Sequence, residues 1–334
     1  MALDRRNNRF FFACRLPGES EVQVFRPAAK AEDADAQLVY HSFKKWGIDV
    51  PVQRSEESLA SLAQEEFVTP PFLGQAEYRS DYINTIERIV RQIQTDDTLE
   101  KVVLSRIHIE SRPENYRPDL HFQALTEAYP DQAVHWIRWK GVGEWMGSSP
   151  ELLLDIQGDR LKTMALAGTL PANRGEWSEK ERLEQETVTQ FIRKQLLDSG
   201  WRIDEEVGPH DRLAGPVRHL ETRFYASGQS NPRDLLNRLH PTPAVLGWPR
   251  EQALNCIQEN EPYSRAFYTG YWGLEQADHS RFYVNLRCLS LHEQAVVFYM
   301  GGGLNAHSNP EREWEETEEK RSAVFAHFHE AKHQ

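Results

Sequence analysis

The sequence predicts an α+β fold in which antiparallel β-sheets pack against flanking helices. The order of the predicted strands indicates this fold class, and the composition indicates that the chain can form a core. Apolar strand patterns occur in adjacent groups and do not alternate regularly with helices, as they do in parallel α/β folds. Hydrophobic residues make up 39% of the 334 residues, including 15 Phe, 11 Tyr and 9 Trp, which is enough for a substantial core. The length suggests two domains or one large one.

The chain divides into a variable N-terminal part, residues 1–75, and a more regular region, residues 76–330. We expect both to belong to one domain. The N-terminal part contains predicted strands at 9–16 and 21–25 and ends at the prolines Pro70 and Pro71. Residues 80–95 place five apolar side chains on one helical face and predict an amphipathic helix. Further strands are predicted at 101–107, 133–139, 144–147, 151–156, 162–167, 267–273, 282–289 and 295–300, and further helices at 120–129, 176–199 and 311–331.

The charge balance limits the classes of partner. Lys and Arg number 39 and Asp and Glu 51, so the formal charge is 39 − 51 = −12, which argues against nucleic acid and anionic membranes. A site for an anion must therefore be built locally from Arg, Lys, a metal ion or the backbone. The three cysteines, Cys14, Cys256 and Cys288, form no paired motif, so we expect a reducing, cytoplasmic location. No stretch is apolar enough to span a membrane.

The segment 301–320 is the most informative in the chain. The glycines 301–303 follow an apolar strand pattern and predict a bare-backbone loop, and residues 308–310 predict a helix start. In the following helix Glu313, Glu316, Thr317 and Lys320 share one face. Carboxylates beside exposed backbone suit Mg²⁺ together with an anionic ligand. The alternative is a solvated acidic helix.

A second acidic helix follows the strand at 162–167. Glu181 and Glu184 lie three residues apart and share a face. Two such pairs in one chain could place opposed carboxylates on either side of one cation, whereas a single pair is typical of a solvated surface.

Four single residues are candidates for a functional role. Lys101, at the start of an apolar strand, is either a solvent-reaching lysine or a base with a lowered pKa. Glu151 precedes Leu152 and is either an edge carboxylate or a general acid. Arg287 is a paired structural arginine or a carboxylate clamp, and His219 could equally be a buried, hydrogen-bonded histidine.

Taken in order, these segments resemble the chorismate-utilising enzymes, and most closely the isochorismate synthases. The resemblance extends over about residues 76–325. It rests on the segments Lys101-Val-Val-Leu-Ser-Arg106, Gly147-Ser-Ser-Pro-Glu151, Leu166-Ala-Gly-Thr-Leu-Pro171, Glu181-Arg-Leu-Glu184, Val217-Arg-His-Leu220, Leu239-His-Pro-Thr-Pro-Ala-Val-Leu-Gly247-Trp-Pro249, Phe267-Tyr-Thr-Gly270, Val284-Asn-Leu-Arg287 and the glycine-to-lysine segment 301–320. It implies the chorismate-binding fold, like that of anthranilate synthase component I.

The resemblance also implies roles for single residues. Lys101 would activate water for attack on C2 of chorismate, and Glu151 would protonate the departing C4 hydroxyl. Mg²⁺ would be held by Glu184 and Glu316, supported by Glu181 and Glu313. Substrate carboxylates would contact Tyr268, Arg287, Gly303 and Lys320, and the pocket would be lined by Gly168, Thr169 and His219.

We therefore predict a Mg²⁺-dependent isochorismate synthase, an isomerase that forms a monomer or a weak homodimer. Lys101 and Ala167 stand where relatives that use ammonia or a lysine nucleophile carry other residues, so both favour water. The alternatives are a salicylate synthase, which also eliminates pyruvate, and a non-catalytic domain that binds divalent cations. The sequence does not distinguish menaquinone from siderophore biosynthesis. Gln185 and the pair Leu304-Asn305 depart from the usual family residues.

Overall fold

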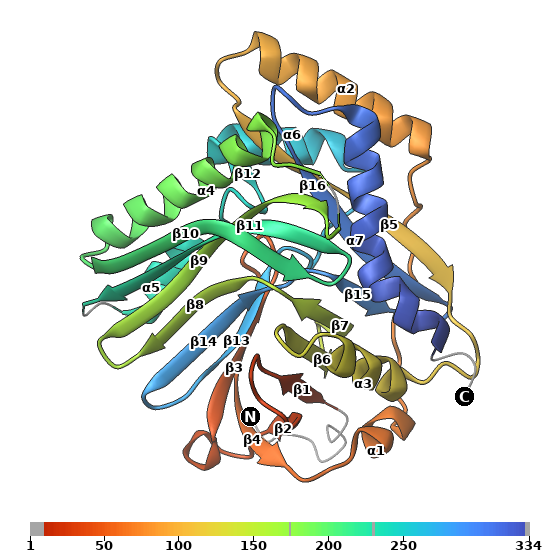
Figure 1. The fold of residues 1–334 in the computed structure, drawn as a ribbon. Helices are drawn as coiled ribbons and strands as arrows, with labels where there is room; N and C mark the ends of the chain where they lie inside the picture. The colour runs from red at the N-terminus through yellow and green to blue at the C-terminus, as the bar shows by residue number, and fades with distance from the viewer. Residues whose placement is uncertain (1–9, 174, 229–230, 331–334) are drawn as a thin grey trace.

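The computed structural model describes residues 10–173, 175–228 and 231–330. Within them, sixteen strands form one antiparallel sheet in the order β10-β11-β9-β8-β14-β13-β3-β4-β2-β1-β6-β7-β15-β16-β5-β12 (Figure 1). The strands are β1 Phe11–Arg15, β2 Gln23–Pro27, β3 Ala36–His41, β4 Gly47–Ser55, β5 Lys101–Ser111, β6 Ala133–Trp139, β7 Gly143–Ser149, β8 Leu152–Gln157, β9 Arg160–Pro171, β10 Arg202–Ala214, β11 Val217–Ser227, β12 Gly247–Trp248, β13 Tyr271–Glu275, β14 His279–Val284, β15 Cys288–Leu291 and β16 Ala295–Leu304.

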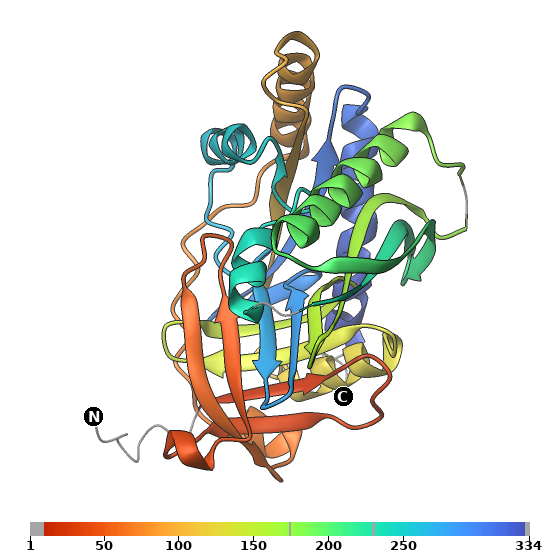
Figure 2. The ribbon, with the colours of Figure 1, turned by 90° about the vertical axis from the view of Figure 1, so that its left-hand side faces the viewer.

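Helices flank this sheet, so the predicted α+β class is confirmed. Figures 1 and 2 show α4 lying across strands β9, β10 and β11 at one end of the sheet, and α7 running along β16. The N-terminal strands β1–β4 lie in the middle of the sheet order, between β13 and β6. The helices are α1 Leu59–Gln64, α2 Arg79–Thr95, α3 Pro118–Ala128, α4 Glu179–Asp198, α5 Pro232–Leu239, α6 Arg250–Asn260 and α7 Pro310–Glu330.

Helix α4 is fixed at its start by a capping box and along its length by apolar packing. The Ser178 side chain accepts from the backbone of the first turn, and the Glu181 carboxylate accepts from Ser178 N at 3.0 Å. Val188, Phe191 and Ile192 are buried against β8, β9 and β11. Each such side chain contributes about 1.5–3 kcal/mol on burial. The first turn of α4 is therefore held firmly over the end of β9.

Helix α7 begins where the sequence predicted. Asn309 Oδ1 accepts from Arg312 N at 3.2 Å, and Pro310 is the first helical residue, where its missing N–H costs nothing. Phe328, near the other end, is buried in the core that includes β1 and β16. The predicted ends at Arg9 and Ala331 lie outside the described residues.

Three predicted elements differ from the structure. The glycines 301–303 are not a loop but continue β16, because β5 pairs with them through Ser105, Leu104 and Val103. Residues 267–270 form a turn, and the strand begins only at Tyr271. The predicted strand 282–289 is interrupted after Val284, where the side chain of Asn285 donates to Phe267 O at 2.9 Å.

Two further observations concern the whole described chain. Cys14, Cys256 and Cys288 are all buried and free. None of the helices in the described ranges is long and apolar enough to cross a membrane.

Candidate active site

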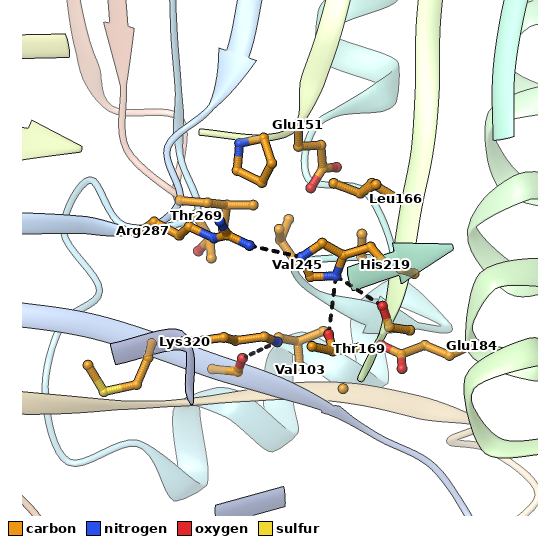
Figure 3. A pocket seen from close by; sticks show the side chains of 18 of the residues that line it. Val103, Glu151, Leu166, Thr169, Glu184, His219, Val245, Thr269, Arg287 and Lys320 are labelled. Carbon is orange, nitrogen blue, oxygen red and sulfur yellow. Dashed lines mark hydrogen bonds between the residues drawn. The ribbon is translucent and has the colours of Figure 1, made fainter. Parts of the chain in front are cut away.

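A pocket lies where β9 and β11 meet β5, β16 and the two loops before β13 and β15 (Figure 3). Its cavity volume is about 80 Å³. Nine predicted site residues line it, namely Glu151, Gly168, Thr169, Glu184, His219, Tyr268, Arg287, Gly303 and Lys320. Residues 168, 219, 287 and 303 come from four different strands or strand ends, so the fold gathers groups that are far apart in sequence.

A β-bulge at Gly168 shapes one wall. Thr169 pairs with His219 and Ala167 with Leu220, so Gly168 is an extra residue on β9. Its φ of +67° favours glycine, and a Cβ there would lie 3.1 Å from Glu181 Cβ. The bulge turns the Gly168 carbonyl toward His219, whose Nδ1 lies 3.0 Å from that oxygen.

His219 orients Arg287, as Figure 3 shows. Because His219 Nδ1 must donate to the Gly168 carbonyl, its Nε2 is free to accept from Arg287 Nη2 at 3.0 Å. Burial, followed by the charges of Arg287 and Lys320, holds the pKa of His219 well below its ordinary value, which keeps the ring neutral. His219 is thus a buried, hydrogen-bonded histidine whose partner is the predicted clamp.

Arg287 itself is buried and remains a cation. Burial lowers its pKa to about 10, which still leaves it charged near neutral pH. Its φ of +45° is unusual for a residue with a side chain, and Thr269 in the facing loop has φ +58°. Such backbone persists where surrounding contacts hold it, and it is concentrated at functional sites.

Glu151 enters the pocket between β7 and β8 and lies near Leu166 (Figure 3). Burial raises the pKa of this carboxyl to about 8, even though the charge of Lys101 acts in the opposite direction. Glu151 is therefore protonated at neutral pH and can donate a proton.

Lys101 lies directly behind the pocket, against Glu184. Its Nζ is 3.1 Å from Glu184 Oε1, a close ion pair that lacks hydrogen-bond geometry, so the nitrogen is buried without a hydrogen-bond partner. Burial lowers the pKa of Lys101, although Glu184 acts against this change. Glu184 is pulled the other way: burial would raise its pKa, but Lys101, Lys180 and Lys320 outweigh this and bring it to about 2.

The carboxylates of α4 and α7 meet around a lysine that sequence reasoning missed. Lys180 Nζ lies 3.1 Å from Glu313 Oε1, 3.6 Å from Glu184 Oε2 and 3.7 Å from Glu316 Oε2. Burial and Glu316 raise the pKa of Glu313 to about 7, while Lys180 acts to lower it. Lys320 donates to Glu316 Oε1 at 2.7 Å and to Gly301 O at 2.9 Å. Glu313 and Glu316 of the predicted α7 face therefore meet Glu184 of α4.

The strand glycines leave room for these carboxylates. A Cβ on Gly303 would lie 2.0 Å from Glu184 Oε1, and one on Gly302 would lie 3.3 Å from Glu313 Oε2. Glu313 Oε2 is buried with no hydrogen-bond partner. A buried, unpartnered carboxylate oxygen over bare backbone suits a hard cation such as Mg²⁺. As they stand, however, no three carboxylate, imidazole or thiol groups within the described ranges are close enough to chelate a metal.

Glu181 stands apart from this cluster. One oxygen of its carboxylate is committed to the capping box with Ser178, and no ion pair of Glu181 with the three lysines is recorded in the described part of the chain. The supporting role of Glu181 toward a cation stays a prediction. The spacing Ser-x-x-Glu before a helix was visible in the sequence and is the pattern of a capping box.

Sequence comparison identifies the family to which this pocket belongs. A family model described as "Chorismate binding enzyme" matches residues 50–328. The chain is a member of the chorismate binding enzyme family. Within this family it is similar to isochorismate synthase EntC of Escherichia coli (strain K12), with 31% identity over 244 residues that cover 69% of this chain and 62% of that protein. It is 29% identical over 268 residues to isochorismate synthase MenF of the same organism, covering 74% and 59%.

The chain therefore spans about six tenths of the length of these curated family members. Solved structures share its fold more completely. MenF, described as the menaquinone-specific isochorismate synthase from Escherichia coli, superimposes with a TM-score of 0.78 at 21% identity, over 98% of this chain and 92% of that one. Anthranilate synthase component I from Streptococcus pneumoniae gives a TM-score of 0.66 at 15% identity, over 94% and 89%. The predicted chorismate-binding fold is thus confirmed.

Proposed function

We propose that this chain converts chorismate to isochorismate and that it requires Mg²⁺. The observation that carries the proposal is a pair of buried groups, Glu151 in the wall of the pocket and Lys101 behind Glu184, whose pKa values are shifted in opposite directions. Burial lowers the pKa of Lys101 and raises that of Glu151, so it favours the form of Lys101 that accepts a proton and the form of Glu151 that donates one. That combination is what exchange of a hydroxyl between two ring carbons needs.

The residues divide the reaction between them. The deprotonated form of Lys101, which its lowered pKa favours, takes a proton from a water molecule as the water oxygen bonds to C2. Both ring double bonds shift, and the C4 hydroxyl leaves with the proton of Glu151 as water. Arg287 and Lys320, the cationic side chains that line the pocket in Figure 3, bind the carboxylates of the substrate. Lys101 and Glu151 exchange protonation states, so the reverse reaction restores them.

A divalent cation would be held by Glu184 and Glu316, with Glu313 beside them, at the face of Gly302 and Gly303. When bound, it would supply positive charge to the ring carboxylate of the substrate. This role suits a protein with a formal charge of −12, which needs local cations to bind a dianion.

Identification of the product distinguishes isochorismate formation from salicylate and anthranilate formation. With chorismate and Mg²⁺, we expect a mixture of chorismate and isochorismate that is reached from either direction, because the two compounds are nearly equal in energy. Chromatography of the reaction, with a lactate dehydrogenase assay for pyruvate, measures it. Pyruvate released in proportion to substrate consumed would assign salicylate synthesis, and anthranilate formed with ammonium would contradict the role of Lys101.

The metal site is tested by Glu184→Gln and Glu316→Gln. Each variant should weaken Mg²⁺ binding and chorismate binding together by ~10-fold or more, because one charge near the cation is lost from a buried site. Calorimetric titration of chorismate at several Mg²⁺ concentrations measures the coupling. Glu315→Gln, at an exposed position of α7 next to Glu316, is the control. Chorismate affinity that does not depend on Mg²⁺ would exclude the site.

The pathway follows from the product. Relatives include proteins described as menaquinone-specific and vibriobactin-specific isochorismate synthases. We infer that a downstream enzyme which consumes isochorismate for menaquinone or a siderophore uses the product of this chain.

A further inference from the structure

The cluster between α4 and α7 is balanced by the protein's own cations. Three carboxylates, Glu184, Glu313 and Glu316, face three ammonium groups, Lys101, Lys180 and Lys320. Five of the six carboxylate oxygens lie within 4.0 Å of a lysine nitrogen, and the sixth, Glu313 Oε2, has no hydrogen-bond partner. The groups proposed to bind Mg²⁺ are thus already neutralised.

The three lysines divide these oxygens unequally. Lys101 pairs with Glu184 at Oε1, and Lys320 pairs with Glu316 at Oε1. Lys180 pairs with the other oxygen of each of these carboxylates, Glu184 Oε2 and Glu316 Oε2, and also with Glu313 Oε1. Of the three lysines, Lys180 is therefore the one that contacts all three carboxylates, and its ammonium group lies between them.

We propose that Lys180 is a built-in competitor of the divalent cation: it occupies the cation position in the metal-free protein and is displaced when the metal binds. This inference rests on the proposed Mg²⁺ site. It explains why the carboxylates, as described, do not form a chelating group. It also assigns to Lys180 a role in setting metal affinity, distinct from the proton transfer assigned to Lys101.

The local structure allows such an exchange. The first turn of α4 is fixed by the Ser178 capping box, and the Lys180 carbonyl accepts from Asn305 Nδ2 at 3.1 Å, so the backbone stays in place. The ammonium is carried on a flexible four-carbon stem and can move without the helix. Its departure frees three carboxylate oxygens at once, one from each glutamate. A divalent cation that binds these oxygens brings twice the charge of the ammonium group that it replaces.

Lys180→Met keeps most of the side-chain volume and removes the charge. We expect this variant to bind Mn²⁺, used as a probe for Mg²⁺, at least ~10-fold more tightly than the unchanged protein, because no ammonium has to be displaced. Electron paramagnetic resonance of free Mn²⁺ measures the affinity without turnover. Lys180→Gln, which can still accept and donate hydrogen bonds, should shift the affinity in the same direction.

A matched control lies on the same helix. Lys194, near the other end of α4, pairs with Asp198 at 2.8 Å and is mostly exposed. Lys194→Met removes one positive charge from the same element and should leave Mn²⁺ affinity within ~2-fold. The comparison separates displacement from a general change in the field of the protein.

Thermal unfolding supplies a second readout. Without Lys180 the three carboxylates repel one another, so Lys180→Met should unfold at a lower temperature in EDTA. Because ligand binding stabilises the folded state, the gain in melting temperature with saturating Mg²⁺ should be larger for this variant than for the unchanged protein.

The outcomes are distinguishable. Unchanged or weaker Mn²⁺ binding in both Lys180 variants, with the folded circular dichroism spectrum retained, would overturn the competitor role and make Lys180 a structural partner. Absence of Mn²⁺ binding in the unchanged protein and in all variants would instead overturn the metal site on which the proposed function depends.

Discussion

Replacing Lys101 with methionine is expected to lower turnover by ~10²–10⁴-fold, the usual cost of removing a general base. Methionine fills the same buried space, and Glu184 keeps its contact with Lys180, so the fold should persist. Steady-state formation of isochorismate measures the effect, and circular dichroism checks the fold. Lys140→Met, at an exposed turn between β6 and β7, controls for loss of one positive charge.

The Lys101 variant should retain Mn²⁺ binding, since Lys101 is assigned to water activation and not to holding the cation. Turnover within ~3-fold of the unchanged protein would remove Lys101 from the mechanism. A parallel loss of Mn²⁺ affinity would instead point to its contact with Glu184 Oε1 as the main contribution.

Replacing Glu151 with glutamine should also reduce turnover by ~10²–10⁴-fold, because glutamine preserves the shape of the side chain but has no acidic proton to transfer. In the unchanged protein the acid must be protonated, so kcat/KM should fall as the pH rises through about 8, the pKa to which burial raises Glu151. The pH profile of kcat/KM measures this alkaline limb. A profile that stays flat up to pH 10 would contradict the assignment.

The same group links stability to pH. Its folded pKa lies above the ordinary value of 4.5, so folding favours the protonated carboxyl. The stabilising contribution is therefore fully present below pH 4.5 and is lost as the pH rises toward 8. Denaturant unfolding of the unchanged protein and of Glu151→Gln at pH 5 and pH 8 should show a larger decrease for the protein that carries the carboxyl.

Local patterns in the sequence were sufficient for the elements that pack through one face. The helix α2 buries Ile86 and Ile89 as its periodicity predicted, and α7 begins at Pro310 after its cap. The glycines 301–303 were misassigned because three glycines usually weaken a strand, whereas here the ladder with β5 holds them. Such support comes from residues some two hundred positions away and leaves no local pattern.

In the candidate site, too, local spacing predicted some residues, and others became evident only from contacts between distant segments. Spacing predicted that Glu313, Glu316 and Lys320 share a face, and the structure places them together. Lys180 was missed because a lysine in the first turn of an acidic helix is typical of a solvated surface. Only the approach of α7 to α4 makes it a buried partner of three carboxylates.

The pairing of β5 with β16 has a consequence for synthesis of the chain. Val103 pairs with Gly303, so one wall of the pocket joins two segments that are synthesised 200 residues apart. Pairing over such a separation closes a very long loop, which slows folding and prolongs exposure of unpaired strand edges. A nascent chain can complete its central strands, including β1 with β6, while still attached to the ribosome. It cannot assemble the pocket until β16 and the start of α7 have emerged, so the proposed acid and base are enclosed together only after residues 295–320 have been synthesised.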